Sequence, residues 1–205
     1  STIEDPVEKD LPNITQTSVN VTAGMTFAVG LRALLRQDPD IIMIGETRDA
    51  ETAEISVRSA ITGHLVVSTL HTNDAISSIV RLADMGVAPY LISNSVVGIV
   101  AQRLVRKVCQ FCKYEEPVTA EDIAIVGDGI PMITRGKGCK VCNNTGYKGR
   151  ISIHEMVYID KTLKRMIARS ADSQEMLEYA KKTQGMRSLM VTTPEEVMKI
   201  AYYSD

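Results

Sequence analysis

The stretch from Asp38 to Asn73 reads DPDIIMIGETRDAETAEISVRSAITGHLVVSTLHTN and decides the fold. In it, two short apolar runs, IIMI and LVVST, flank a segment whose apolar residues recur at helical spacing. This pattern is typical of a β-α-β unit in a parallel sheet. Ligands of open α/β sheets bind beyond the carboxyl ends of the strands. We therefore expect Glu46 and His71, which follow the two runs, to lie at the same edge of the sheet.

Composition narrows the class of protein. The chain has 205 residues, of which 44% are hydrophobic, with a net charge of −2. That length suits one sizeable core with or without an appendage. The charge balance argues against a chain-wide electrostatic footprint for nucleic acid and leaves open only a local basic patch, so we expect no nucleic-acid partner. No apolar run reaches the length of a membrane span.

The periodicity of the rest of the chain predicts further elements. In chain order these are an edge strand within residues 9–22, a helix over 25–36, a strand over 41–44, a helix over 50–61, a strand over 65–69, and helices over 75–85, from 89 to about 104, 161–169, 173–183 and 194–202. Asp49 and Asp160 are suited to cap two of the helices, and either Asn73 or Asp74 a third. Pro194 fits the first turn of the last helix.

Four cysteines stand as two pairs, Cys109-x-x-Cys112 and Cys139-x-x-Cys142, within a Gly-rich stretch at 108–149 that has little periodicity. Two such pairs supply the four thiolates of a tetrahedral Zn²⁺ site. A site with four protein ligands has no open position for water, so we expect a structural zinc. The residues between the pairs should form a loop or a hairpin. Free thiols or a redox site are the alternatives.

Carboxylates near strand ends are the candidate catalytic groups. Glu46 follows an apolar run, as does a carboxylate that holds Mg²⁺ beside nucleotide phosphates. The acidic cluster of Glu4, Asp5 and Glu8 is either solvated surface, which composition favours, or the acidic end of a strand that faces a metal-bound ligand. His64 and His71 bracket the second run and are too far apart along it to share a metal.

The phosphate-binding pattern G-x-x-x-x-G-K-[ST] occurs nowhere in the printed sequence. Gly136-Lys137-Gly138 has the Gly-Lys step, but a glycine follows the lysine.

Several segments in fixed order resemble the secretion ATPase family, the hexameric motors of type II secretion and type IV pilus assembly. They are TIEDPVE (2–8), LRALLRQDPDIIMIGETRDAETAE (31–54), TGHLVVSTLHTNDA (62–75), RLADMG (81–86) and QRLVRKVC-x-x-C (102–112). The resemblance implies a RecA-like (P-loop NTPase) α/β fold with a partly parallel sheet, a small zinc-binding subdomain and a C-terminal helical part. The expected division is 1–104, 105–154 and 155–205.

The resemblance also implies roles for individual residues. Glu4, Asp5 and Glu8 match the family's Asp box, with Glu8 as the proposed general base. Glu46 matches the Walker B glutamate near Mg²⁺, and Arg48 follows it. His64 and His71 match the His box.

The function implied is an ATP-hydrolysing homohexamer that drives type IV pilus assembly or type II secretion. It would act through an inner-membrane platform protein at the cytoplasmic face of that membrane, with ATP, Mg²⁺ and Zn²⁺ as cofactors. The cysteine pairs favour the assembly and secretion branch over the retraction ATPases.

The family's Walker A loop is expected before Ser1, so the chain by itself is expected to lack turnover. A non-catalytic, zinc-stapled interaction module and a nucleic-acid translocase are the alternatives from other classes.

Overall fold

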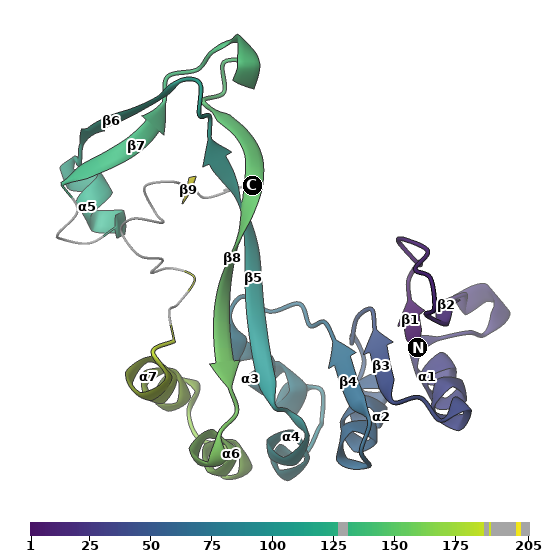
Figure 1. The fold of residues 1–205 in the computed structure, drawn as a ribbon. Coiled ribbons are helices and arrows are strands. Elements are labelled where there is room, and N and C mark those ends of the chain that lie inside the picture. The colour runs from purple at the N-terminus through teal and green to yellow at the C-terminus, as the bar shows by residue number, and fades with distance from the viewer. Residues whose placement is uncertain (127–130, 187–188, 190–199, 202–205) are drawn as a thin grey trace. The chain divides into compact units, whose positions relative to one another are not determined.

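The computed structural model describes residues 1–126, 131–186, 189 and 200–201 (Figure 1). The chain forms two compact units. The first comprises Ser1–Ile99 and Val157–Gln184, and the second comprises Val100–Met156 and Gly185–Asp205. The division at 104 and 154 that the sequence suggests stays a prediction. In the described part of the chain, no helix is long and apolar enough to cross a membrane.

A parallel sheet organises the first unit (Figure 1). Its strands are β1 (Thr2–Glu4), β2 (Gln16–Ser18), β3 (Ile41–Ile44) and β4 (Leu65–Ser68), in the order β2-β1-β3-β4. All three strand pairs are parallel. The predicted β-α-β unit is confirmed, because α2 (Ala50–Ile61) joins β3 to β4. The edge strand expected within 9–22 is β2.

The remaining helices of the first unit begin close to their predicted positions. They are α1 (Phe27–Leu34), α3 (Ala75–Asp84), α4 (Pro89–Ser95), α6 (Lys161–Ala168) and α7 (Ser173–Gln184), with short 3₁₀ turns at Val21–Ala23 and Leu35–Gln37. Asp49, Asp74 and Asp160 cap α2, α3 and α6 through side-chain oxygens that accept backbone N–H groups. Gly86, with φ of 90°, follows α3 in the left-handed conformation that ends many helices.

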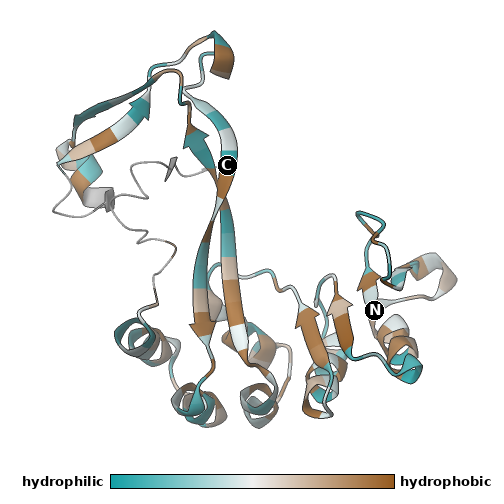
Figure 2. Ribbon diagram, viewed as in Figure 1, coloured by the Kyte–Doolittle hydropathy of each residue, from teal (hydrophilic) through white to brown (hydrophobic). Residues whose placement is uncertain are grey.

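The core of this unit lies between α1 and the sheet. It consists of Ile3, Phe27, Leu31, Leu34, Ile42 and Ile44. Figure 2 shows β3 and β4 as hydrophobic along their length, as expected for strands of a parallel sheet. Gly30 lets α1 approach β1, because a Cβ at residue 30 would lie 2.0 Å from Cδ1 of Ile3.

The helix predicted from Pro89 to about Leu104 is wrong beyond α4. The chain leaves helix after Ser95 and enters the long strand β5 (Gly98–Val108). The reason lies in the sequence VVGIV at 96–100, since β-branched side chains lose rotamer freedom in a helix and pack well in a strand. In β5, Ala101, Val105 and Val108 are buried.

The second unit contains strands and short helical turns (Figure 1). Besides β5 from Val100 onward, they are β6 (Lys113–Pro117), α5 (Ala120–Val126), β7 (Met132–Gly136), the 3₁₀ turn η3 (Lys140–Cys142), β8 (Tyr147–Tyr158, whose last two residues belong to the first unit) and β9 (Ile200–Ala201). β8 and β9 flank β5, and β6 pairs with β7. The predicted helix at 194–202 lies outside the described residues except for Ile200–Ala201, where it is wrong, since these residues pair with Arg106 and Lys107 of β5.

Candidate functional site

Three strand ends meet at one edge of the parallel sheet. Ile3 of β1 is in register with Ile44 of β3, and Ile44 is in register with Ser68 of β4. The residues after each strand therefore leave from the same edge, where α/β sheets bind ligands. Gly45 makes room for this convergence, because a Cβ there would lie only 3.3 Å from Cα of Glu4.

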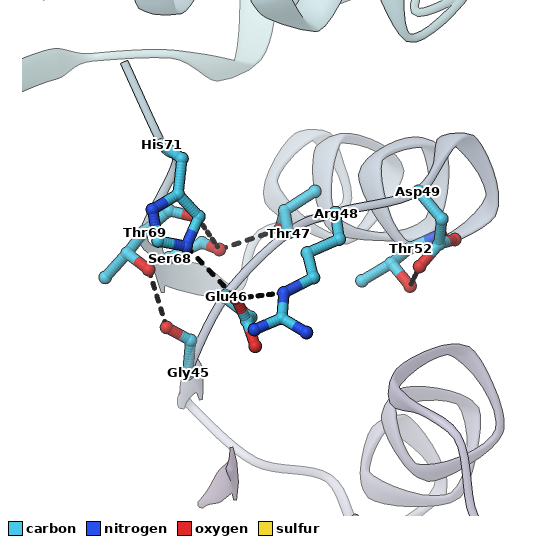
Figure 3. Close-up of polar contacts among 9 residues, drawn as sticks. All are labelled: Gly45, Glu46, Thr47, Arg48, Asp49, Thr52, Ser68, Thr69 and His71. Atoms are coloured by element: carbon cyan, nitrogen blue, oxygen red, sulfur yellow. Dashed lines mark hydrogen bonds and ion pairs between the residues drawn. The ribbon is translucent and has the colours of Figure 1, made fainter. Parts of the chain in front are cut away.

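Glu46 is the centre of this edge. Its side chain is 12% exposed, and Oε2 accepts a hydrogen bond from Nε of Arg48 and lies 3.3 Å from Nε2 of His71 (Figure 3). The expected proximity of Glu46 and His71 is confirmed. Arg48 and His71 are largely exposed, so the guanidinium and the imidazole both reach a buried carboxylate from the solvent side.

Hydroxyl groups tie the β3 and β4 ends together on either side of Glu46 (Figure 3). Thr69 Oγ1 donates to the carbonyl of Gly45 at 2.6 Å, and the N–H of Thr47 donates to the carbonyl of Thr69 at 2.9 Å. The hydroxyls of Thr47 and Ser68 lie 2.8 Å apart. Sequence reasoning did not predict these contacts between the strand ends, although the hydroxyl residues at the end of an apolar strand were the available signal.

The helix after this edge is firmly capped. Asp49 Oδ1 accepts from the N–H of Thr52, and Oδ2 from its hydroxyl, both at 2.8 Å. Thr52 is fully buried. Because Asp49 follows Arg48 directly, the cap fixes where the Glu46–Arg48 segment meets α2.

The acidic cluster at the end of β1 divides into buried and exposed members. Glu4 is buried, and its carboxylate accepts hydrogen bonds from the hydroxyl of Thr2 at 2.5 Å and the amide of Gln16 at 3.0 Å. These bonds, with one from the backbone N–H of Glu8, hold the pKa of Glu4 below its ordinary value. Asp5 and Glu8 are exposed. Glu4 thus anchors the loop that carries Glu8.

His64 lies away from the other predicted site residues. It precedes β4, at the amino end of the strand, whereas His71 follows the carboxyl end. Its Nδ1 lies 3.1 Å from the carbonyl of Ser59, near the end of α2. Within this chain, His64 is not brought together with Glu46.

The four cysteines of the second unit form one cluster. Their sulfurs lie within 4.8 Å of one another, with separations of 3.9 Å for Cys109–Cys139, 3.8 Å for Cys112–Cys142 and 3.7 Å for Cys139–Cys142. A disulfide needs about 2.05 Å, so none is formed. Four sulfurs about 2.3 Å from a central ion lie about 3.8 Å apart in a tetrahedron. The donor set and its spacing fit Zn²⁺.

The backbone around the cysteines is shaped by glycines. Gly136 and Gly146 approach so closely that a Cβ at residue 136 would lie 2.1 Å from the carbonyl oxygen of Gly146. The predicted hairpin between the cysteine pairs is confirmed as β6–β7, with Lys113 opposite Gly136. The cluster therefore joins the hairpin to the start of β8.

The thiols of the cluster differ in acidity. Burial raises the pKa of Cys112 to about 12. Burial also acts to raise that of Cys142, but the N–H groups of Cys139 and Gly146 donate to its sulfur at 3.2 and 3.3 Å, and its pKa falls to about 6. Because thiolates are the metal-binding form, these N–H groups favour a ligand at Cys142.

Relatives are found over nearly the whole chain. It is 49% identical to the type II secretion system protein HxcR of Pseudomonas aeruginosa over 97% of this chain and 41% of that protein. It is 47% identical to the type IV pilus assembly ATPase PilB of Thermus thermophilus over 96% of this chain and 24% of that protein. The chain thus spans less than half of these curated relatives.

Solved structures agree with the fold. The pilus retraction motor PilT with bound ADP matches with a TM-score of 0.62 at 26% identity, over 95% of this chain and 53% of that one. The ATPase DotB of Legionella pneumophila shares the fold, with a TM-score of 0.56 at 23% identity, over 92% of this chain and 44% of that one. The model of the family "Type II/IV secretion system protein" matches residues 1–202. The chain therefore belongs to the type II/IV secretion system protein family, with its RecA-like α/β fold.

Proposed function

We propose that this chain carries the Mg²⁺ and γ-phosphate side of the ATP site of a motor ATPase. The observation that carries the proposal is the buried Glu46 carboxylate, held by Arg48 and His71 at the carboxyl edge of a parallel sheet. Membership of a family that includes an ATPase named for pilus assembly supports the same reading.

In this proposal each residue of the edge has a distinct task. Glu46 would hold Mg²⁺ directly or through water, and the ion would offset charge on the transferring phosphate. Glu8, exposed on the loop that Glu4 anchors, would accept a proton from the attacking water. His71 and Arg48, whose side chains are 82% and 64% exposed, would donate to phosphate oxygens and so report the loss of the phosphate.

The outer strand supports a larger sheet in the intact protein. β4 is at the end of the described sheet, and Leu65 and Val67 are 52% and 49% exposed. Parallel strands are ordinarily buried on both faces and paired on both edges. We propose that a further strand, bearing the phosphate-binding loop, pairs with β4. His64, at the opposite end of β4, would then serve a different part of the assembly.

The second unit has a structural task in this proposal. Zn²⁺ held by Cys109, Cys112, Cys139 and Cys142 would join the β6–β7 hairpin to β8. With four sulfur ligands it would leave no position for water or substrate.

The intact protein is proposed to work as a homohexamer at the cytoplasmic face of the inner membrane. There it would drive filament assembly through a platform protein, either for type IV pili or, as second candidate, for type II secretion. The similarity to HxcR, a type II secretion system protein, supports type II secretion as the second candidate.

Steady-state turnover tests the proposal. The intact protein should hydrolyse ATP in the presence of Mg²⁺, and addition of DNA or RNA should leave the rate unchanged. The 205-residue chain by itself should lack turnover. It would then act only as a non-catalytic interaction module organised by zinc. Absence of turnover in the intact, folded protein would reject the motor, and nucleic-acid stimulation would favour a translocase.

A further inference from the structure

The backbone hydrogen-bond ladder between the parallel strands β3 and β4 ends shortly before Glu46, and a side-chain bond follows it. Regular pairing ends with Ile44 opposite Ser68. Beyond it, the carbonyl of Gly45 accepts from the hydroxyl of Thr69 at 2.6 Å. The hydroxyl of Thr69 thus replaces a backbone donor in linking the strands. The backbone at Glu46 is therefore outside the regular ladder.

The two sides of Glu46 are both tied to the end of β4. On one side stands the bond from Thr69 to Gly45. On the other, the N–H of Thr47 donates to the backbone carbonyl of Thr69 at 2.9 Å, and the hydroxyls of Thr47 and Ser68 lie 2.8 Å apart. His71 follows Thr69 by two residues. The ties therefore set the separation between the backbones that carry Glu46 and His71 (Figure 3).

We propose that Thr69, with Thr47, is a positioning residue that holds the carboxylate of Glu46 within reach of His71. The inference rests on the proposed function, since it assigns these hydroxyls a purpose in phosphate transfer. They do not touch the reacting atoms; they fix the two groups that do.

Because the side chain of Thr69 is exposed, a role in positioning can be distinguished by experiment from a role in stability. Thr69 is exposed, so water can replace its hydroxyl at Gly45 and the thermal midpoint of unfolding should hardly change. The rate of turnover is more sensitive than the unfolding midpoint to a small displacement of Glu46, because a displacement of about 1 Å costs on the order of 100-fold in rate. We expect a partial displacement and a loss of about 10-fold in kcat.

The test uses the intact protein with Thr69→Val, which keeps the shape, and Thr69→Ser, which keeps the hydroxyl. Thr22→Val, at an exposed threonine in the Val21–Ala23 turn, is the matched control. Thr69→Val should lower kcat about 10-fold with KM for Mg·ATP within about twofold, while the other two variants stay within about twofold of wild type. In a His71→Ala background, Thr69→Val should cost less than about twofold, because coupled residues are non-additive.

A readout independent of turnover is exchange of the Thr47 amide hydrogen, measured by NMR. This amide donates to the backbone carbonyl of Thr69, which every variant keeps. A shift of that carbonyl on loss of the Thr69 hydroxyl should therefore accelerate exchange about 10-fold in Thr69→Val, and exchange should remain unchanged in Thr69→Ser. If Thr69→Val keeps the wild-type kcat and the wild-type exchange rate of the Thr47 amide while Glu46→Gln is inactive, the positioning role is overturned and the proposed function stands. Lack of turnover in wild type would instead reject the proposed function and, with it, the assigned purpose of these hydroxyls.

Discussion

Removal of one thiolate from the cysteine cluster should weaken zinc binding and loosen the second unit. Three of the sulfur separations, at 3.7–3.9 Å, match the edge of a tetrahedron whose centre lies about 2.3 Å from each sulfur, the length of a Zn–S bond. All four sulfurs lie within 4.8 Å of one another. Structural zinc binding is worth about 10–16 kcal/mol in small zinc domains, or about 3 kcal/mol for each of four ligands. Cys112→Ser should therefore bind zinc roughly 100-fold more weakly.

Two measurements on the intact protein check this. Metal analysis should find about one zinc per chain in wild type, and X-ray absorption should fit a single shell of four sulfurs near 2.3 Å. Competition with a chromophoric chelator should give the weakened affinity of Cys112→Ser. Gln110→Ala, between the two cysteines of the first pair, is the matched control and should keep its zinc.

The consequence for folding follows from the position of the cluster. It links the β6–β7 hairpin to β8, so metal loss should raise hydrogen exchange in Lys113–Pro117 and Met132–Gly136 while β3 and β4 stay protected. A stably folded, metal-free wild-type protein, or a shell of nitrogen and oxygen ligands, would refute the reasoning.

Two further predictions concern the first unit. Leu31→Ala removes a fully buried side chain between α1 and the sheet and should lower the free energy of unfolding by about 2–5 kcal/mol, measured by urea denaturation; a loss below about 1 kcal/mol would contradict the packing described. Burial acts to raise the pKa of Asp160, but hydrogen bonds, including those from the N–H of Leu163 and the hydroxyl of Tyr179, lower it overall. Asp160 should therefore add stability above its unfolded pKa of about 3.9 and lose that contribution as pH falls through the lower folded value. Asp160→Asn should cost about 1 kcal/mol at pH 7 and little at pH 2, by thermal unfolding, and an equal loss at both would count against the charge.

The sequence predicted the β-α-β unit because its signals are local. IIMI and LVVS are short, branched and apolar, and Asp49 provides both the stop to the loop and the cap of α2. Parallel pairing then places Glu46 and His71 at one edge without further information. The long gap between the cysteine pairs predicted a loop or a hairpin there, and the structure has the β6–β7 hairpin.

Two kinds of feature escaped prediction. The prediction of helix beyond Ser95 is wrong because Pro89 does start a helix, and the length of that helix depends on whether Val96 and Val97 pack in a helix or a strand. The ties of Thr69 and Thr47 depend on which residues face each other across two strands, and this register is fixed only by folding. Hydroxyl residues beside a strand are too common to indicate such contacts by themselves.

The most direct test of the central claim is the effect of Glu46→Gln on the intact protein, with ATP binding and hydrolysis measured separately. Glu54→Gln, which removes an exposed carboxylate of α2 paired with Arg58, is the control. The account predicts that Glu46→Gln lowers kcat by on the order of 100-fold or more, while ATP binding stays within about 10-fold and Glu54→Gln resembles wild type. Wild-type turnover in Glu46→Gln would contradict the assignment of this sheet edge to the ATP site.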